Sequence, residues 1–249
     1  CAMSGDAVGD LADLVDEARE LYATDAAAIE QLDRYARRLH EPLRLAVAGM
    51  VKAGKSTVLN ALIGEQIAPT DAGECTRIVT WYRYARTARI TAHLVGGGEV
   101  RLPVTRSNGA LVLDLGGYTA DEVARIDVEW PSESLRSTIL IDTPGNASLS
   151  QEVSDRTTRF LTPSSAPSEA DAILYLLRHI HGSDVRFLEA FRDTAAGGSQ
   201  TVNAVALLSR ADEIGSGRID SLLSAARIAE RYRQDGELRS LALGCIPVA

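Results

Sequence analysis

The sequence predicts an α/β fold, in which a mostly parallel central sheet carries helices on both faces and a long helix precedes the sheet. Three observations predict this fold class. From residue 42 onward, short apolar runs typical of buried strands alternate with helical segments. A glycine-containing loop at residues 49–56 joins a predicted strand to a predicted helix. Before residue 42, apolar residues recur at seven-residue intervals, which favours a helix packed against other helices.

The composition is that of an ordinary globular domain. Hydrophobic residues make up 45% of the 249 residues and charged residues 24%, which excludes a disordered, collagen-like or rod-like chain. The net charge is -8. Non-specific nucleic-acid binding requires clustered Lys and Arg, so we expect no nucleic-acid partner. The three cysteines form no CxxC pair and therefore predict neither a disulfide framework nor a zinc site.

The N-terminal segment is predicted to be one long helix over residues 10–40. Two apolar rows at heptad spacing run along it: Leu11, Ala18, Leu32 and Leu39, and Leu14, Leu21, Ala28 and Tyr35. Asp25 is the one polar residue in these rows, and Pro42 ends the helix near His40. The helix belongs either to a helical bundle or to a surface of its own domain, and both interpretations stay open. We divide the chain into residues 1–41, of which 1–2 are expected to be an expression remnant, and residues 42–249.

The remaining elements follow the apolar pattern. Strands are predicted at residues 43–48, 78–84, 89–95, 123–130, 138–141, 172–177, 202–208 and 241–249. Helices are predicted at residues 55–63, 184–195 and 220–232. The glycine clusters within residues 96–117 indicate a hairpin with a loop.

Residues 49–56 match the phosphate-binding pattern GxxxxGK[ST] in full. They are Gly49, Met50, Val51, Lys52, Ala53, Gly54, Lys55 and Ser56. They follow a predicted strand and open a predicted helix, the context that the motif requires. Backbone N–H groups and the helix N-terminus would then cradle phosphate oxygens. We predict that Lys55 bridges the β- and γ-phosphates, that the Ser56 hydroxyl ligates Mg²⁺, and that Thr57 reaches an α-phosphate oxygen. The alternative is a chance match that binds nothing.

Two later motifs indicate which nucleotide is bound. Asp142 to Gly145 fits DxxG, in which Asp142 holds Mg²⁺ through water and the Gly145 N–H senses the γ-phosphate. The alternative for these residues is a plain turn. Ser209, Arg210 and Asp212 resemble the guanine-reading pattern [NT]KxD, although Ser and Arg replace the usual residues. The Asp212 carboxylate can accept hydrogen bonds from guanine but would face a lone pair on adenine, so the motifs favour GTP over ATP.

In this order the motifs resemble those of the GTPase superfamily, and the intervening residues are similar to dynamin-like proteins. These are LNALIG at 59–64, APT at 68–70 and CTR at 75–77, together with the long interval between Lys55 and Asp142. The resemblance is greatest to the isoniazid-inducible dynamin-like group of actinobacteria. It implies a P-loop GTPase domain, preceded by the first helix of a neck bundle, and GTP or GDP with Mg²⁺ at the site.

The resemblance also implies roles for individual residues. Thr76 would contact Mg²⁺ through its hydroxyl and the attacking water through its carbonyl, with Thr70 and Thr80 as rival candidates. Val51 and Lys52 stand where many dynamins have Gln and Ser, and that Ser helps to hold a monovalent cation. Our hypothesis is that the Lys52 ammonium supplies the positive charge itself, and the alternative is a solvated lysine.

The expected function is GTP hydrolysis coupled to pairing of GTPase domains and to membrane remodelling or fusion. Membrane lipid would be contacted through parts absent from this chain, at the cytoplasmic face of the plasma membrane. We expect the chain to be truncated before the closing helix of the domain, because its last predicted strand runs to residue 249. One alternative is a regulatory GTP switch in ribosome or septum assembly. Another is a nucleotide-dependent scaffold with negligible hydrolysis.

Overall fold

The computed structural model describes residues 6–69, 77–144, 161, 168–195, 202–214, 217 and 219–249. The chain forms two compact units, Cys1–Pro42 and Leu43–Ala249, and each is described by itself. Across the described residues, none of the helices has the length and apolarity that crossing a bilayer requires.

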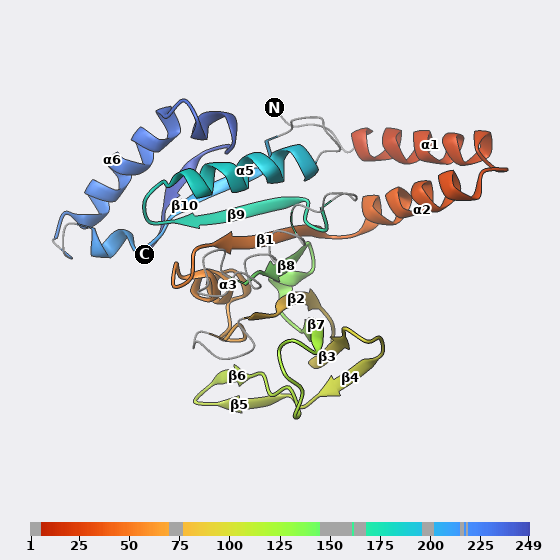
Figure 1. Cartoon of the computed structure of the whole chain (residues 1–249), viewed down its shortest axis with the longest axis horizontal. Helices are drawn as coiled ribbons and strands as arrows, with labels where there is room; N and C mark the ends of the chain where they lie inside the picture. Colours follow the sequence, from red (N-terminus) through yellow and green to blue (C-terminus); the bar gives the residue numbers. More distant parts are fainter. Residues whose placement is uncertain are drawn as a thin grey trace. The chain divides into compact units, whose positions relative to one another are not determined.

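The first unit contains two helices, so the prediction of one long helix is wrong. Helix α1 (Asp6–Leu21) and helix α2 (Ala26–His40) run antiparallel (Figure 1). Asp25 is the physical reason for the break. Its backbone is extended, and its carboxylate accepts hydrogen bonds from the N–H groups of Ala27 and Ala28. An aspartate in this position caps a new helix and ends the preceding one. An ion pair of 2.8 Å from Arg19 Nη2 to Asp33 Oδ1 joins the two helices.

The second unit is built on one sheet. Its nine strands are β1 (Leu43–Gly49), β2 (Val79–Tyr84), β3 (Arg89–Leu94), β4 (Glu99–Leu102), β7 (Val123–Trp130), β8 (Thr138–Asp142), β9 (Ala172–Leu177), β10 (Ala204–Leu208) and β11 (Cys245–Pro247). Their order is β11-β10-β9-β1-β8-β2-β7-β3-β4. The five strands from β11 to β8 are mutually parallel, β2 is antiparallel to β8, and β3 is antiparallel to both of its neighbours. The predicted mostly parallel sheet is confirmed.

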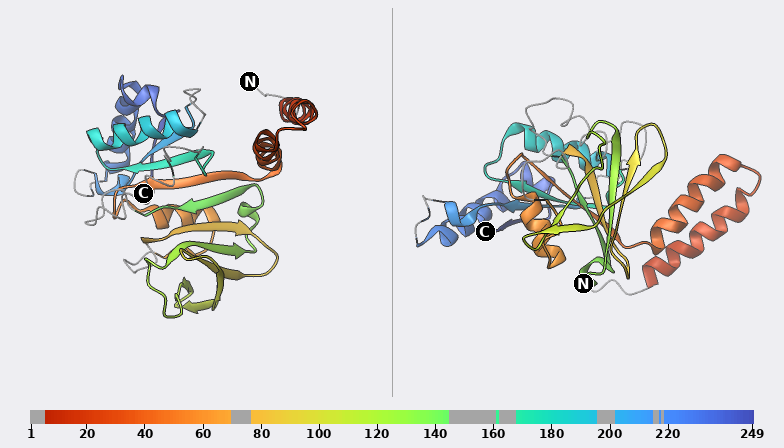
Figure 2. Two further views of the ribbon diagram at one scale, coloured as in Figure 1. Left: turned by 45° about the vertical axis from the view of Figure 1, so that its right-hand side comes forward. Right: turned by 90° about the horizontal axis from the view of Figure 1, so that it is seen from below.

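Helices cover both faces of the parallel part, as predicted (Figure 2). Helix α3 (Lys55–Ile63) packs on one face through Leu59 and Ile63. Helices α5 (Gly182–Ala195) and α6 (Ser221–Gln234) pack on the other, where Phe191 is fully buried among apolar residues of the sheet. The carboxyl ends of β1, β8, β9 and β10 meet at one edge, because these strands are parallel. Ligands of α/β folds bind at this edge, where the strand order reverses.

Three smaller features complete the unit. Within residues 96–117, β4 extends the sheet and a separate hairpin forms from β5 (Thr105–Ser107) and β6 (Ala110–Val112). Its turn is Asn108-Gly109, both with positive φ, as two-residue hairpin turns require. The last strand is shorter than the predicted 241–249. Leu241 caps the preceding 3-10 helix η4 (Leu238–Ser240), and β11 begins only at Cys245. Two more 3-10 helices are η2 (Glu133–Leu135) and η3 (Ala211–Glu213).

Candidate nucleotide-binding site

The loop of residues 49–56 begins where β1 meets β9. Gly49 has a φ of 139°, and a Cβ placed there would lie 2.3 Å from the carbonyl oxygen of Leu176 on β9. No other residue fits at this position without moving the backbone of the neighbouring strand. The requirement for glycine therefore comes from sheet packing as well as from phosphate chemistry.

The loop turns through two further residues with positive φ, Lys52 at 63° and Gly54 at 95°. Between them lies Ala53, which is buried and donates its N–H to the Met50 carbonyl. Alternating backbone handedness of this kind shapes loops that bind anions. Met50, Val51 and Lys52 are exposed. The Lys52 side chain is therefore on the surface of the loop.

Lys55 and Ser56 open α3 beneath this loop. Lys55 Nζ donates to the carbonyl oxygens of Gly49 and Met50, at 3.4 and 3.3 Å. Burial lowers the pKa of Lys55, and the nearby Asp142 carboxylate opposes that shift. Burial raises the pKa of Asp142 to about 6, whereas the Lys55 ammonium and a hydrogen bond from the Ser56 hydroxyl act in the opposite direction. The structure thus brings together the three side chains that the sequence assigned to the phosphates and the metal.

The Ser56 and Asp142 pair suits Mg²⁺. Among the described residues, no three His, Cys, Asp or Glu side chains are grouped so as to hold a metal ion. Mg²⁺ does not require such a group, because proteins usually bind it through one or two carboxylates together with phosphate oxygens and water. A hydroxyl and a carboxylate, hydrogen-bonded to each other beside a phosphate loop, are the hard oxygen donors that it prefers.

Thr143 anchors the end of β8 to β1. Its buried hydroxyl donates to the Val47 carbonyl at 2.8 Å, and Val47 pairs with Asp142 in the parallel ladder. This contact fixes Asp142 next to the phosphate loop. Gly145, which completes the DxxG motif, lies outside the described residues, and so do Thr76 and Thr70. Thr80 is described: it is buried on β2 and its hydroxyl lies 3.4 Å from the Ile78 carbonyl.

The candidate guanine-reading residues follow β10 at the same edge. Ser209 is buried, and both its N–H and its hydroxyl donate to the Leu177 carbonyl. Arg210 has a φ of 55°, and its Nη2 donates to the Lys52 carbonyl at 3.2 Å. Asp212 lies exposed on η3. Arg210 therefore links this motif to the phosphate loop, although 158 residues separate the two partners in sequence.

One further residue has a positioning role that our sequence analysis did not assign. The Asn60 side chain accepts hydrogen bonds from the N–H groups of Ile67 and Ala68 and donates to the Ala68 carbonyl. Residues 66–68 are also held by the hairpin, because Leu111 of β6 donates its N–H to the Gln66 carbonyl. Asn60 lies within the LNALIG run, so the run carried a signal, but only the folded chain shows its partners.

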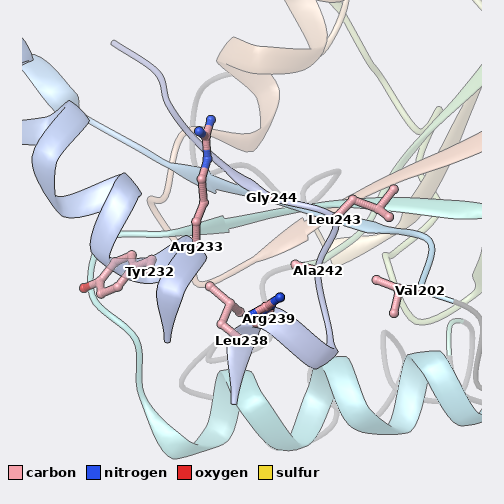
Figure 3. Close-up of a pocket in the computed structure, with 8 residues that line it drawn as sticks. All are labelled: Val202, Tyr232, Arg233, Leu238, Arg239, Ala242, Leu243 and Gly244. Carbon is pink, nitrogen blue, oxygen red and sulfur yellow. The ribbon is translucent and has the colours of Figure 1, made fainter. Parts of the chain in front are cut away.

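A separate pocket of about 380 Å³ lies beside α6, η4 and the residues before β11 (Figure 3). Tyr232, Arg233, Arg239 and Leu243 are among the residues that line it. None of its lining residues belongs to the phosphate loop or to the two later motifs. This pocket is therefore distinct from the candidate nucleotide site.

Comparison with known proteins identifies relatives of this chain. The sequence profile of the Dynamin family matches residues 45–193. The isoniazid-induced protein IniC of Mycobacterium tuberculosis is 44% identical over 219 residues, which are 88% of this chain and 44% of that protein. A bacterial dynamin-like protein of Nostoc punctiforme is 48% identical over 54 residues, or 22% of this chain and 8% of that protein. This chain thus spans less than half the length of the curated relatives that it matches.

A solved structure also matches nearly the whole chain. It is an oligomerised bacterial dynamin pair, described as providing a mechanism for the long-range sensing and tethering of membranes. The match has a TM-score of 0.61 at 16% identity, and it covers 99% of this chain and 37% of that one. At this identity the likeness shows a shared fold.

Proposed function

Because the chain belongs to the dynamin family and carries the GTPase domain of that family, we propose that it couples Mg²⁺-dependent GTP hydrolysis to pairing of GTPase domains and to remodelling or fusion of membranes. One observation carries the hydrolytic part. Lys55, Ser56 and Asp142 interact at the carboxyl edge of the sheet, and Arg210 contacts the same loop. These contacts support a single site that combines the proposed phosphate loop, the proposed metal ligands and the proposed guanine-reading residues.

The proposed roles follow from the chemistry of each group. The Lys55 ammonium would donate to the β- and γ-phosphate oxygens and offset their charge, together with N–H groups of the loop. Ser56 and Asp142 would hold Mg²⁺, which neutralises charge on the phosphate oxygens when it is bound. Asp212 would accept the N1–H and N2–H₂ hydrogens of guanine, and Arg210 would stack on the base. Thr76 would orient the attacking water, and the Gly145 N–H would contact the γ-phosphate.

Membrane action is the less direct part of the proposal. A match to a bacterial dynamin pair that is described as tethering membranes supports it. We propose that lipid is contacted by other parts of the full-length protein at the inner face of the plasma membrane. Nucleotide-driven pairing would then transmit force to those parts.

Lys55→Ala tests the hydrolytic part. Because Lys55 is the half-buried cation beside Asp142, we expect its loss to lower the GTPase rate by about 100-fold or more, measured as phosphate release. Arg89→Ala is the control, since this exposed arginine pairs with Glu129 on the outer part of the sheet. Unchanged turnover in Lys55→Ala would overturn the assignment of the site.

Membrane action is tested separately with the full-length protein and liposomes that contain anionic phospholipid. We expect GTP-dependent tubulation, tethering or content mixing, visible by electron microscopy or fluorescence. Hydrolysis without any change in the liposomes would favour the regulatory switch. Single-turnover measurements showing tight GTP binding without cleavage would favour the scaffold.

A further inference from the structure

An ion-pair network surrounds the arginine that replaces lysine in the guanine-reading motif. Arg210 Nη1 donates to both carboxylate oxygens of Glu213, at 2.8 and 3.2 Å. Its Nη2 donates to the Lys52 carbonyl at 3.2 Å. Both terminal nitrogens of the guanidinium are therefore engaged in fixed directions, which orients its plane. A lysine ammonium has three rotatable donors and no plane, so it would need no such orientation.

A second arginine holds Glu213 in turn. Arg178 Nη2 donates to Glu213 Oε2 at 2.6 Å. The sheet explains why the two residues meet. Leu177 at the end of β9 pairs with Leu208 at the end of β10, so Arg178 and Ser209 leave the sheet side by side. The Ser209 N–H then donates to the Leu177 carbonyl, and η3 turns Glu213 back toward β9.

The network consists of partly exposed groups, which sets the size of its effect. Arg178, Arg210 and Glu213 expose 48%, 39% and 51% of their side chains. A single exposed pair contributes little to stability, because water screens it and ordering the side chains costs entropy. A network in which one carboxylate orders two arginines is suited to positioning a group, more than to holding the fold together.

We propose that Glu213, held by Arg178, is a positioning residue for guanine recognition. It orients the Arg210 guanidinium as a flat surface for the base and keeps Arg210 against the phosphate loop at Lys52. This inference rests on the proposed function, because it assumes that the base lies at Arg210. It adds two residues to the site that the motif does not contain. They act on nucleotide affinity and leave the reacting atoms untouched.

The test separates KM from kcat in Glu213→Ala and Arg178→Ala. Since the network positions the base, we expect KM for GTP and Kd for GDP to rise by about three- to tenfold, with kcat within twofold of the unaltered protein. Glu213→Gln retains one acceptor oxygen and should show an intermediate Kd. Glu133→Ala is the matched control. It breaks a similar exposed ion pair, between Glu133 on η2 and Arg136 just after η2, and should leave Kd unchanged.

A double-mutant cycle then tests the linkage between the two residues. Arg178 acts only through Glu213, so Arg178→Ala/Glu213→Ala should weaken GDP binding no more than Glu213→Ala alone. Additive losses would overturn the proposed chain of contacts. Unchanged Kd in Glu213→Ala, or a loss of kcat with unchanged KM, would also overturn it. These outcomes are distinct from failure of the proposed function, which Lys55→Ala reveals by retaining hydrolysis.

Discussion

At the scale of single residues, Lys52 departs most from the pattern of the dynamins that this chain resembles. It has a φ of 63°, a conformation that costs energy for a non-glycine residue, and its side chain is exposed. Its carbonyl accepts the Arg210 hydrogen bond, so the backbone at this position already has a partner. Under our hypothesis, the exposed ammonium is the part of Lys52 that acts on the phosphates. Our hypothesis that it replaces a bound monovalent cation stays a prediction.

Lys52→Ser tests that hypothesis. If the ammonium offsets charge in the transition state, the variant should lose about tenfold or more of kcat in buffer without K⁺ or Na⁺. Adding K⁺ should restore part of the rate, because serine then supplies an oxygen ligand for the ion. Phosphate release is measured in choline buffer and in KCl at equal ionic strength. Normal turnover of the variant without K⁺ or Na⁺ would disprove the idea.

The local part of the site could be predicted residue by residue, and its long-range part could not. Gly49, Lys55 and Ser56 lie in one contiguous motif whose backbone geometry dictates residue type. Asp142 was predictable because it ends an apolar strand. Glu213 has no such signal, since its two arginine partners are common surface residues whose proximity depends on the pairing of β9 with β10.

At the scale of elements, the N-terminal unit shows the limit of a periodic pattern. The heptad rows continue across Asp25, so periodicity alone predicts one helix, while the capping carboxylate divides it. Leu14 and Leu21 of α1 are exposed by 59% and 75%, whereas Val15, which belongs to neither predicted row, is buried. Apolar rows that stay exposed on a helical hairpin favour further helical partners. The bundle therefore remains a proposal.

Asp25→Ala should weaken the first turn of α2. Removing a side-chain cap costs about 1 kcal/mol, within a range of roughly 0.5–2. We expect faster amide hydrogen exchange at Ala27 and Ala28, because their N–H groups donate hydrogen bonds to the Asp25 carboxylate. The exchange is measured by NMR or mass spectrometry. Asp25→Asn is the control, because an amide oxygen also caps. Unaltered exchange in Asp25→Ala would show that Asp25 does not determine where α2 begins.

The strands show the same division between strong and weak signals. Buried strands such as β1 and β8 are nearly continuous apolar runs, so their bounds were predicted closely. Strand β4 and the β5–β6 hairpin are short and largely exposed, and they lack a clear apolar pattern. The glycine clusters within residues 96–117 were the local signal of a hairpin, and Gly109 of the turn between β5 and β6 is among these glycines. What the hairpin contacts depends on the Leu111 and Gln66 hydrogen bond, which no local pattern encodes.

At the scale of the whole molecule, the alternation of strands and helices predicted a doubly covered parallel sheet. It did not predict the strand order. Strand β2 runs antiparallel to β8 and carries β7, β3 and β4 outward, so four strands extend the sheet beyond the nucleotide-binding part. The five parallel strands from β11 to β8 bring the described residues of every motif to one edge of the sheet. That edge lies entirely within Leu43–Ala249.

This confinement leads to a prediction for the two units. If the site and the pairing surface both belong to the unit Leu43–Ala249, a chain that lacks residues 1–42 should still bind GDP with unchanged affinity. It should also shift from monomer to dimer when GDP and aluminium fluoride mimic the transition state, as analytical ultracentrifugation can measure. Pairing in the transition-state complex follows from the proposed coupling, because only a partner bound more tightly in that state promotes hydrolysis.

Lys55→Ala in the same chain is the control and should stay monomeric. Dimers of equal stability with and without nucleotide would contradict nucleotide-driven pairing, and weaker GDP binding by the shortened chain would show that residues 1–42 contribute to the site.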